Sequence, residues 1–137
     1  MDLQIIKIAS ENKNQKYLKN YTHRIKSKNS LCGDEITLSL LLKNEVIKEV
    51  GYECKSCVFC QASINLLTKK IIEMNANNII DLCNQVIDFY EKKEEKIVKN
   101  LSSFKKIFTK ENVSRKECLL LPFKTLRKVL ISKNGKV

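Results

Sequence analysis

The sequence contains very few of the residues that usually form linkers. Its 137 residues include three glycines and one proline, and it has no serine-rich or proline-rich tract and no internal repeat. Segments that join separate modules are typically rich in such residues. With 43% hydrophobic and 30% charged residues, the chain can bury a core without disulfides. We therefore expect one domain spanning residues 1–137.

A long apolar segment is also missing. Near the N-terminus, Ile5, Ile6 and Ile8 are interrupted by Lys7 and followed by polar residues, which is too short a run for a signal core or a membrane span. We therefore expect a cytoplasmic protein without membrane contact. Structural disulfides form mainly in oxidising compartments, so the six cysteines are expected to be thiols.

Acidic residues are scarce in the C-terminal third. Residues 1–91 carry 12 Lys and Arg against 11 Asp and Glu, whereas residues 92–137 carry 14 against 4, so this part holds nearly all of the net charge of +11. Such asymmetry indicates a solvated lysine-rich helical surface, an acidic partner or nucleic acid. The aromatic residues there, Phe104, Phe108 and Phe123, all fit core stripes. No stacking surface is evident, and nucleic acid is not the favoured partner.

Hydrophobic periodicity predicts strands first. Apolar and polar residues alternate over residues 36–42, and an extended pattern resumes over 46–53 after a turn at 43–45, which is typical of an antiparallel hairpin. A third strand is expected before Cys32, although the polar segment 12–29 shows no clear period.

Helices follow the strands. Ile64, Leu67 and Ile71 recur at helical spacing in a helix that begins near Ser56, and a second helix follows after Asn77–Asn78. The stripe of the second helix consists of Ile79, Cys83, Val86 and Tyr90, and residues 91–99 are expected to extend it. The fold class is therefore α+β, with a small antiparallel sheet of about three strands and helices packed on one face.

Two more helical segments are expected towards the C-terminus. Leu101, Phe104 and Phe108 suggest a short amphipathic piece. A final helix is predicted by Leu119, Phe123, Leu126 and Leu130, with Pro122 near its first turn and Cys118 just before it.

Cys32-Gly33-Asp34 places a thiolate and a carboxylate beside a turn-forming glycine. Both side chains can bind a metal, but zinc normally takes four ligands, so distant residues must complete a site. His23, the only histidine, lies in a polar stretch and is expected to face solvent. Cys83 lies on an apolar stripe and is expected to pack in the core.

Three cysteines, Cys54, Cys57 and Cys60, form a Cys-x-x-Cys-x-x-Cys run. The run resembles the opening of a bacterial ferredoxin motif, but Ile64 stands where a fourth cysteine is needed, and a zinc ribbon would require a second Cys-x-x-Cys. A better site joins Cys32 and Asp34 to one cysteine of this run and to Cys118, because all lie at element ends. A helix N-terminus also favours thiolate.

These motifs resemble the U-type iron-sulfur cluster assembly proteins, which comprise the IscU, NifU N-terminal and SufU branches. The likeness spans residues 17–132 and rests on Cys32-Gly33-Asp34 with its hairpin, a mid-chain cysteine opening a helix, and Cys118-Leu119-Leu120-Leu121-Pro122-Phe123. It also selects Cys57, because the family pattern after its second cysteine matches Val58 to Ser63 with Cys60 in place of a serine. Cys60 is expected to pack at the start of the helix. As extra thiols beside Cys57, Cys54 and Cys60 could also bind metal in its place or form a disulfide, so their roles stay open.

Within this family the chain is most similar to the SufU branch. Cys57 and Cys118 are 61 positions apart, which implies an inserted segment at about residues 90–112. Glu117 stands where the IscU branch has histidine, and the chaperone-recognition motif of that branch is missing.

The resemblance implies a site of Cys32, Asp34, Cys57 and Cys118 that holds zinc or a transient iron-sulfur cluster. Sulfur would come from a cysteine desulfurase, with Cys32 as the persulfide acceptor, and would pass to iron-sulfur client or carrier proteins. Whether the protein is a scaffold or a zinc-dependent sulfurtransferase stays open. The alternative function is a basic, zinc-stabilised nucleic-acid-binding module built on residues 92–137.

Overall fold

A computed structural model describes residues 3–92 and 99–132, with the side chains of 99–102 left out. The elements follow in the order α1 (Leu3–Ser10), β1 (His23–Lys28), β2 (Glu35–Lys43), β3 (Val46–Lys55), α2 (Val58–Ile71), α3 (Ala76–Glu91), the short 3-10 helices η1 (Lys99–Lys106) and η2 (Lys110–Arg115), and α4 (Lys116–Ile131). The three strands form one antiparallel sheet in the order β1-β2-β3. The predicted α+β class and the three-stranded sheet are therefore confirmed.

The alternating sequence of β2 separates two faces of the sheet. Ile36, Leu38 and Leu40 are fully buried on the face covered by helices, as period-two alternation predicts. The hairpin to β3 turns at Asn44 and Glu45, both with positive φ, which matches the right-handed twist of the flanking strands. This hairpin fixes where β2 begins and β3 ends, and both of those ends lead into the candidate site.

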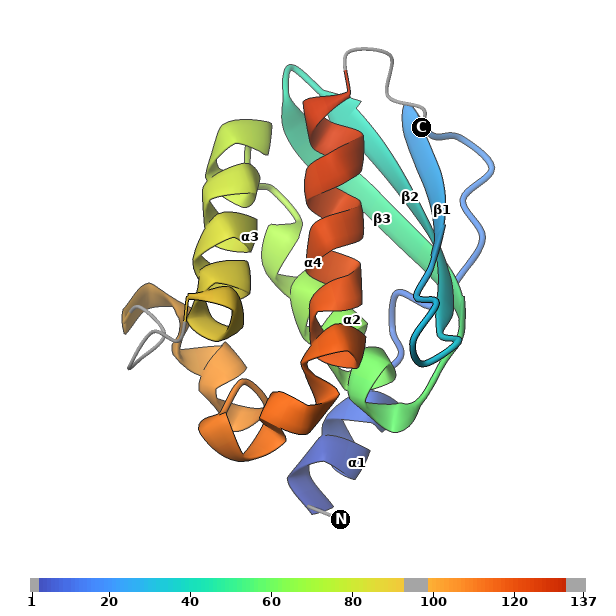
Figure 1. Cartoon of the computed structure of the whole chain (residues 1–137). Helices are drawn as coiled ribbons and strands as arrows, with labels where there is room; N and C mark the ends of the chain where they lie inside the picture. Colours follow the sequence, from blue (N-terminus) through green and yellow to red (C-terminus); the bar gives the residue numbers. More distant parts are fainter. Residues whose placement is uncertain (1–2, 93–98, 133–137) are drawn as a thin grey trace.

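The helices cover one face of the sheet (Figure 1). α4 packs on α2, α3 and β1, while α2 also contacts β3 and α1. Three phenylalanines, Phe104, Phe108 and Phe123, meet edge to face with ring centroids 5.3–6.0 Å apart, a favoured aromatic geometry. This cluster joins the segment before η2 to α4 in the core.

Part of the opposite sheet face is covered by the segment between α1 and β1. A Cβ atom on Gly51 would lie 2.6 Å from the Lys16 carbonyl oxygen, so only glycine permits this close approach. The Arg24 guanidinium lies 3.7 Å from the Tyr21 ring centroid and donates a 2.7 Å hydrogen bond to the Leu18 carbonyl. The same segment also lies along the edge of β3 that does not pair with β2. There, Tyr52 N donates to the Asn14 carbonyl at 3.0 Å.

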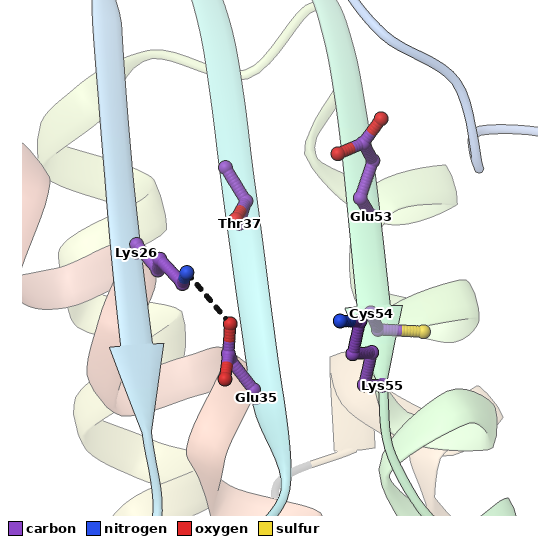
Figure 2. Close-up of a pocket in the computed structure, with 6 residues that line it drawn as sticks. All are labelled: Lys26, Glu35, Thr37, Glu53, Cys54 and Lys55. Carbon is purple, nitrogen blue, oxygen red and sulfur yellow. Dashed lines mark ion pairs between the residues drawn. The ribbon is translucent and has the colours of Figure 1, made fainter.

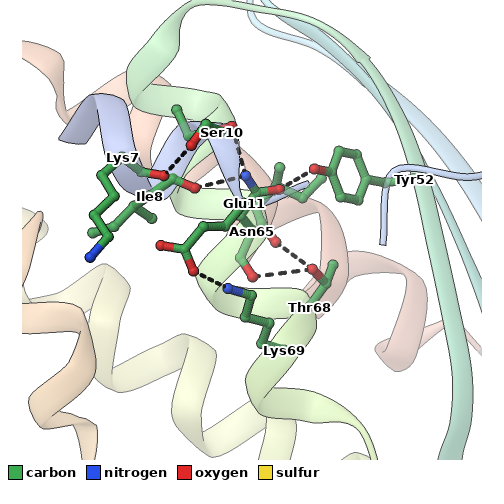
Figure 3. A network of polar contacts seen from close by, with 10 residues as sticks. Lys7, Ile8, Ser10, Glu11, Tyr52, Asn65, Thr68 and Lys69 are labelled. Carbon is green, nitrogen blue, oxygen red and sulfur yellow. Dashed lines mark hydrogen bonds and ion pairs between the residues drawn. The ribbon is translucent and has the colours of Figure 1, made fainter. Parts of the chain in front are cut away.

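A buried polar network attaches α1 to α2 and the sheet (Figure 3). Asn65 donates to the carbonyls of Ile8 and Ala9 at 3.0 and 2.9 Å, and its Oδ1 accepts from the Tyr52 hydroxyl. These carbonyls belong to the last turn of α1, where intrahelical donors run out, and the Ile8 carbonyl also accepts from Glu11 N at 3.1 Å. Asn65 therefore satisfies the end of one helix from the interior of another.

Several boundaries differ from the prediction. α4 begins at Lys116, so Cys118 lies in its first turn rather than before it, and Pro122 lies in the second turn. Asn77 and Asn78 belong to α3, whose N-cap is Asn75; its side chain accepts from Asn78 N at 2.8 Å. The cap, and not the adjacent Asn pair, therefore marks where this helix begins.

Two elements fall in segments without a clear period. β1 lies in the polar stretch before Cys32, and α1 occupies the N-terminal residues for which we predicted no structure. The expected extension of α3 mostly lies outside the described residues, as does the side chain of Leu101. Phe104 and Phe108 are buried, as expected for an amphipathic piece.

Candidate metal centre

The loop between β1 and β2 carries the first two predicted site residues. Gly33 has φ +77°, a left-handed conformation that glycine adopts without steric cost. Asn29 N donates to the Asp34 carbonyl and Gly33 N donates to the Asn29 carbonyl, both at 2.8 Å. The loop is thus a tight turn that leaves the Cys32 thiol exposed and buries Asp34.

Asp34 contacts the start of α2. Its Oδ1 accepts a 2.9 Å hydrogen bond from Cys57 N, and its Oδ2 lies 3.3 Å from Cys57 Sγ. Cys57 is the N-cap residue of α2, where free backbone N–H groups favour negative charge. Cys57 therefore opens a helix, as the sequence predicts, with the carboxylate directly beside its thiol.

Cys118 approaches from the first turn of α4. Burial raises the pKa of its thiol, and hydrogen bonds with Cys57, Cys32 and Asp34 raise it further. A protonated Cys118 is therefore the form that this crowded, acidic environment favours before a cation binds.

These elements bring all four predicted residues together. One ligand atom each from Cys32, Asp34 and Cys118 lies within 4.8 Å of the others, and Cys57 joins them through its contact with Asp34. Among the described residues, no other group of three potential ligands is this compact. Three thiols and one carboxylate form a donor set that suits a tetrahedral zinc ion.

The other thiols are not part of the compact group of ligands, although the charge of Asp34 helps to raise the pKa of the Cys54 and Cys60 thiols. Cys60 is fully buried, and burial raises the pKa of its thiol and of the half-buried Cys54 thiol. The buried Ser56 hydroxyl is near both thiols and partly offsets the effect of burial on their pKa. Cys83 packs in the core, where burial raises its pKa to about 12. Both Cys60 and Cys83 have the buried positions expected of packing residues.

A groove lies on the open sheet face (Figure 2). It has a volume of 260 Å³ and is lined by Lys26, Glu35, Thr37, Glu53, Cys54 and Lys55. Lys26 and Glu35 form a 2.8 Å ion pair across it, but such exposed pairs contribute little energy. The Cys54 sulfur points away from β2 in Figure 2. The groove therefore offers charged surface without a thiol directed into it.

His23 takes no part in the compact group of ligands. It lies on β1, where its Nδ1 is 2.8 Å from the Thr22 hydroxyl and partial burial lowers its pKa. The side chain is partly buried, so it is less open to solvent than the sequence suggested.

A further residue of the site, not predicted from the sequence, is Asn29, which begins the Cys32 loop. Its Oδ1 accepts hydrogen bonds from Leu31 N at 2.8 Å and Cys32 N at 3.3 Å. Asparagine commonly bonds to backbone groups two or three residues later. The position of an asparagine three residues before Cys32 could therefore have indicated this side-chain bond to the loop backbone.

An α+β fold that gathers three thiols and a carboxylate from a sheet loop and two helix N-termini has the donor set of a small metal-binding domain. The NifU-like N terminal domain family matches residues 4–105, a range that includes Cys32, Asp34 and Cys57 and ends before Cys118. The chain therefore belongs to this family of U-type iron-sulfur cluster assembly scaffolds.

Relatives in sequence and structure agree with this assignment. The chain is 34% identical over 105 residues to the iron-sulfur cluster assembly scaffold protein IscU of Thermotoga maritima, covering 75% of this chain and 72% of the relative. It is 30% identical over 113 residues to an uncharacterized protein of Borreliella burgdorferi, covering 82% and 74%.

Two crystal structures show the same fold. A putative iron-sulfur cluster assembly scaffold protein for the SUF system from Fervidobacterium islandicum has a TM-score of 0.87 at 26% identity, covering 95% of this chain and 96% of that one. The N-terminal part of a NifU-like protein from Brucella abortus has a TM-score of 0.83 at 17% identity, covering 93% and 89%. Within residues 3–92 and 99–132, no helix is both long and apolar enough to cross a membrane.

Proposed function

We propose that this protein assembles or transfers iron-sulfur precursors at a centre made of Cys32, Asp34, Cys57 and Cys118. The observation that carries the proposal is the convergence of the Cys32, Asp34 and Cys118 ligand atoms within 4.8 Å, with Cys57 Sγ 3.3 Å from Asp34. The Thermotoga relative is named as an iron-sulfur cluster assembly scaffold protein, which supports cluster assembly as the function. The cluster is the cargo of this centre, and the exchangeable Asp34 carboxylate suits a cargo that must leave.

Zinc is the proposed resident ion of the same four residues. Three thiolates and one carboxylate satisfy its preference for sulfur and oxygen donors. When bound, zinc holds the thiols in their deprotonated form and adds its binding energy to folding. Asp34, buried and already beside Cys57, supplies the negative charge that attracts the ion.

Cys32 is the proposed sulfur acceptor. Its thiol is exposed, whereas Cys118 is buried and Cys57 is half-buried. The Cys32 thiolate attacks the terminal sulfur of a desulfurase persulfide, the donor S–S bond breaks, and the donor cysteine leaves as a thiolate. One S–S bond replaces another, so no external oxidant is required. Client or carrier proteins then take the sulfur or the finished cluster.

The SufU branch is the proposed subgroup. The 61-position interval between Cys57 and Cys118, the Glu117 before Cys118 and the similarity to the Fervidobacterium structure support it. We also propose that residues 90–112 are the branch insertion, that residues 1–137 act as one domain, and that the protein works in the cytoplasm, where six free thiols stay reduced.

Metal analysis tests the centre directly. Protein purified without chelators should contain one zinc per chain, and Cys57→Ser and Cys118→Ser should each lose it. Cys83→Ala removes a buried thiol on α3 and should keep the metal, which makes it the matched control. Wild-type protein that contains neither zinc nor iron and takes up neither would refute the metal centre.

Sulfur transfer is tested separately. Mixed with its desulfurase and cysteine, the wild type should gain one sulfur atom on the peptide that contains Cys32, detected by mass spectrometry under non-reducing conditions. Cys32→Ala should abolish this label and lower the desulfurase rate. If the label persists elsewhere at the wild-type level, Cys32 is not the acceptor.

A further inference from the structure

Asn29 links the two ends of the candidate centre. Its Oδ1 accepts from the backbone N–H groups of Leu31 and Cys32, at 2.8 and 3.3 Å. Because backbone N–H groups only donate, these contacts identify the atom that faces them as the oxygen. The amide nitrogen of Asn29 must therefore point the other way.

That nitrogen reaches across to α4. Nδ2 donates a 3.3 Å hydrogen bond to the carbonyl of Glu117, the residue immediately before Cys118. Asn29 and Glu117 are 88 positions apart in the sequence. One side chain therefore bonds to the backbone of the exposed Cys32 and to the backbone that directly precedes the buried Cys118.

Burial does not fix the tip of the Cys32 loop. Leu31 is 79% exposed, and Cys32 and Gly33 are exposed as well, so burial of these side chains does not hold the loop. Its order rests on hydrogen bonds, and Asn29 makes them with both its main chain and its side chain. A change at Asn29 therefore acts mainly on where the Cys32 thiol lies.

We propose that Asn29 is a positioning residue that sets the separation of the Cys32 and Cys118 thiols. The inference rests on the proposed function, in which these thiols bind the same ion or cluster. When a residue that orients a metal ligand is mutated, the metal affinity typically falls by roughly 10–100-fold. Removal of Asn29 should therefore weaken metal binding by roughly 10–100-fold without removing any ligand.

Two substitutions at Asn29 separate its bonds to the Cys32 loop from its bond to the Glu117 carbonyl. Asn29→Ala removes every side-chain bond. Asn29→Asp retains an acceptor for Leu31 N and Cys32 N but loses the donor to Glu117, and it places a carboxylate oxygen near a carbonyl. Both variants should bind zinc more weakly than the wild type. Their cobalt complexes should show weaker thiolate-to-metal absorption, because Cys32 no longer completes the site.

Asn75→Ala is the matched control. It also removes an asparagine whose Oδ1 accepts a 2.8 Å backbone hydrogen bond, but at the N-cap of α3. It should lower thermal stability while leaving zinc affinity and the cobalt spectrum unchanged. Wild-type zinc affinity in Asn29→Ala would overturn the proposal, and wild-type affinity in Asn29→Asp would overturn the bridging role of Glu117.

A measurement on metal-free protein keeps the inference distinct from the proposed function. A short bifunctional thiol reagent should cross-link Cys32 to Cys118 in the wild type, as identified by peptide mass spectrometry, and more slowly in both Asn29 variants. Equal cross-linking rates would refute the positioning role. If the wild type binds no metal but the cross-linking rates differ, the proposed function fails and the role of Asn29 stands.

Discussion

Asp34 uses its two carboxylate oxygens for two different contacts with Cys57. Oδ1 accepts from the backbone N–H at 2.9 Å, and Oδ2 lies 3.3 Å from the thiol sulfur. The first contact satisfies a free donor at the start of α2, and the second places a negative charge beside a candidate ligand. The same residue therefore caps the start of α2 and is also a candidate ligand of the proposed centre.

Substitutions at Asp34 should separate these two contributions. Asp34→Asn keeps an oxygen for Cys57 N, so the free energy of unfolding of the metal-free protein should change little. Asp34→Ala loses this capping bond and should cost about 0.5–2 kcal/mol. Zinc affinity should fall in both variants, because neither supplies a carboxylate. Urea denaturation and zinc titration measure the two effects.

A different ranking would change the interpretation of Asp34. If the Asn and Ala variants lose the same stability, the bond to Cys57 N contributes no capping energy. If Asp34→Asn binds zinc as tightly as the wild type, Asp34 is not a ligand.

The link between α1 and α2 gives a second prediction. Asn65→Ala removes two bonds to α1 carbonyls and leaves the Tyr52 hydroxyl without its partner. Unpaired buried polar groups cost about 1–3 kcal/mol each, so the variant should lose roughly 2–4 kcal/mol and exchange the amide hydrogens of residues 3–10 faster. Tyr52→Phe keeps both α1 bonds and is the control. Equal exchange in all three proteins would contradict this role.

The core thiol of Cys83 predicts a pH dependence. Burial raises its pKa from 9.0 to about 12, so above pH 9 the unfolded chain ionises a thiol that the folded chain keeps protonated. Stability from this group is therefore complete below pH 9 and is lost as the pH rises towards 12, by up to about 1.4 kcal/mol per pH unit.

Metal-free wild type and Cys83→Ala can be compared by urea denaturation at about pH 8 and about pH 10. The wild type should lose more stability between these conditions than the variant. Identical losses would mean that Cys83 ionises in the folded protein as easily as in the unfolded chain.

Binding to nucleic acid should be weak and non-specific. Phe104, Phe108 and Phe123 are buried against one another, so they are not available to stack on bases. Random DNA in an electrophoretic shift assay at physiological salt should show no discrete complex. A tight complex that weakens steeply with salt would instead support the basic nucleic-acid-binding module.

The sequence was most informative where one face of an element is buried. Alternation along β2 predicts Ile36, Leu38 and Leu40 as inward residues, and all are fully buried. Once the hairpin is in register, Asp34 and Cys57 necessarily approach, because Glu35 and Lys55 are paired neighbours. Local periodicity could therefore place two parts of the centre before any tertiary contact was known.

Other features depend on contacts that no local pattern encodes. β1 contains a single apolar residue, Ile25, which is buried, so no period can show in its sequence. Arg24 of β1 instead contacts the Tyr17 and Tyr21 rings, which come from an earlier segment. The N-terminal helix is fixed by Asn65, which lies far away in the sequence. The start of α4 also escaped prediction, because the charged residues Lys116 and Glu117 precede its apolar stripe.

Pro122 divides α4 into a first part held by contacts with other elements and a second part held by its own helical hydrogen bonds. Proline has no N–H, so residue 122 cannot donate to the carbonyl of Cys118, four positions earlier. The turn that bears Cys118 is instead tied to its neighbours, through Asn29 to Glu117 and through Ser63 to Leu119 at 2.5 Å. Displacement of the Cys118 turn therefore breaks contacts with a loop and with α2 while the helical ladder beyond Pro122 stays intact. If Cys118 is a ligand as proposed, its release can thus be a local event that the rest of the fold does not have to follow.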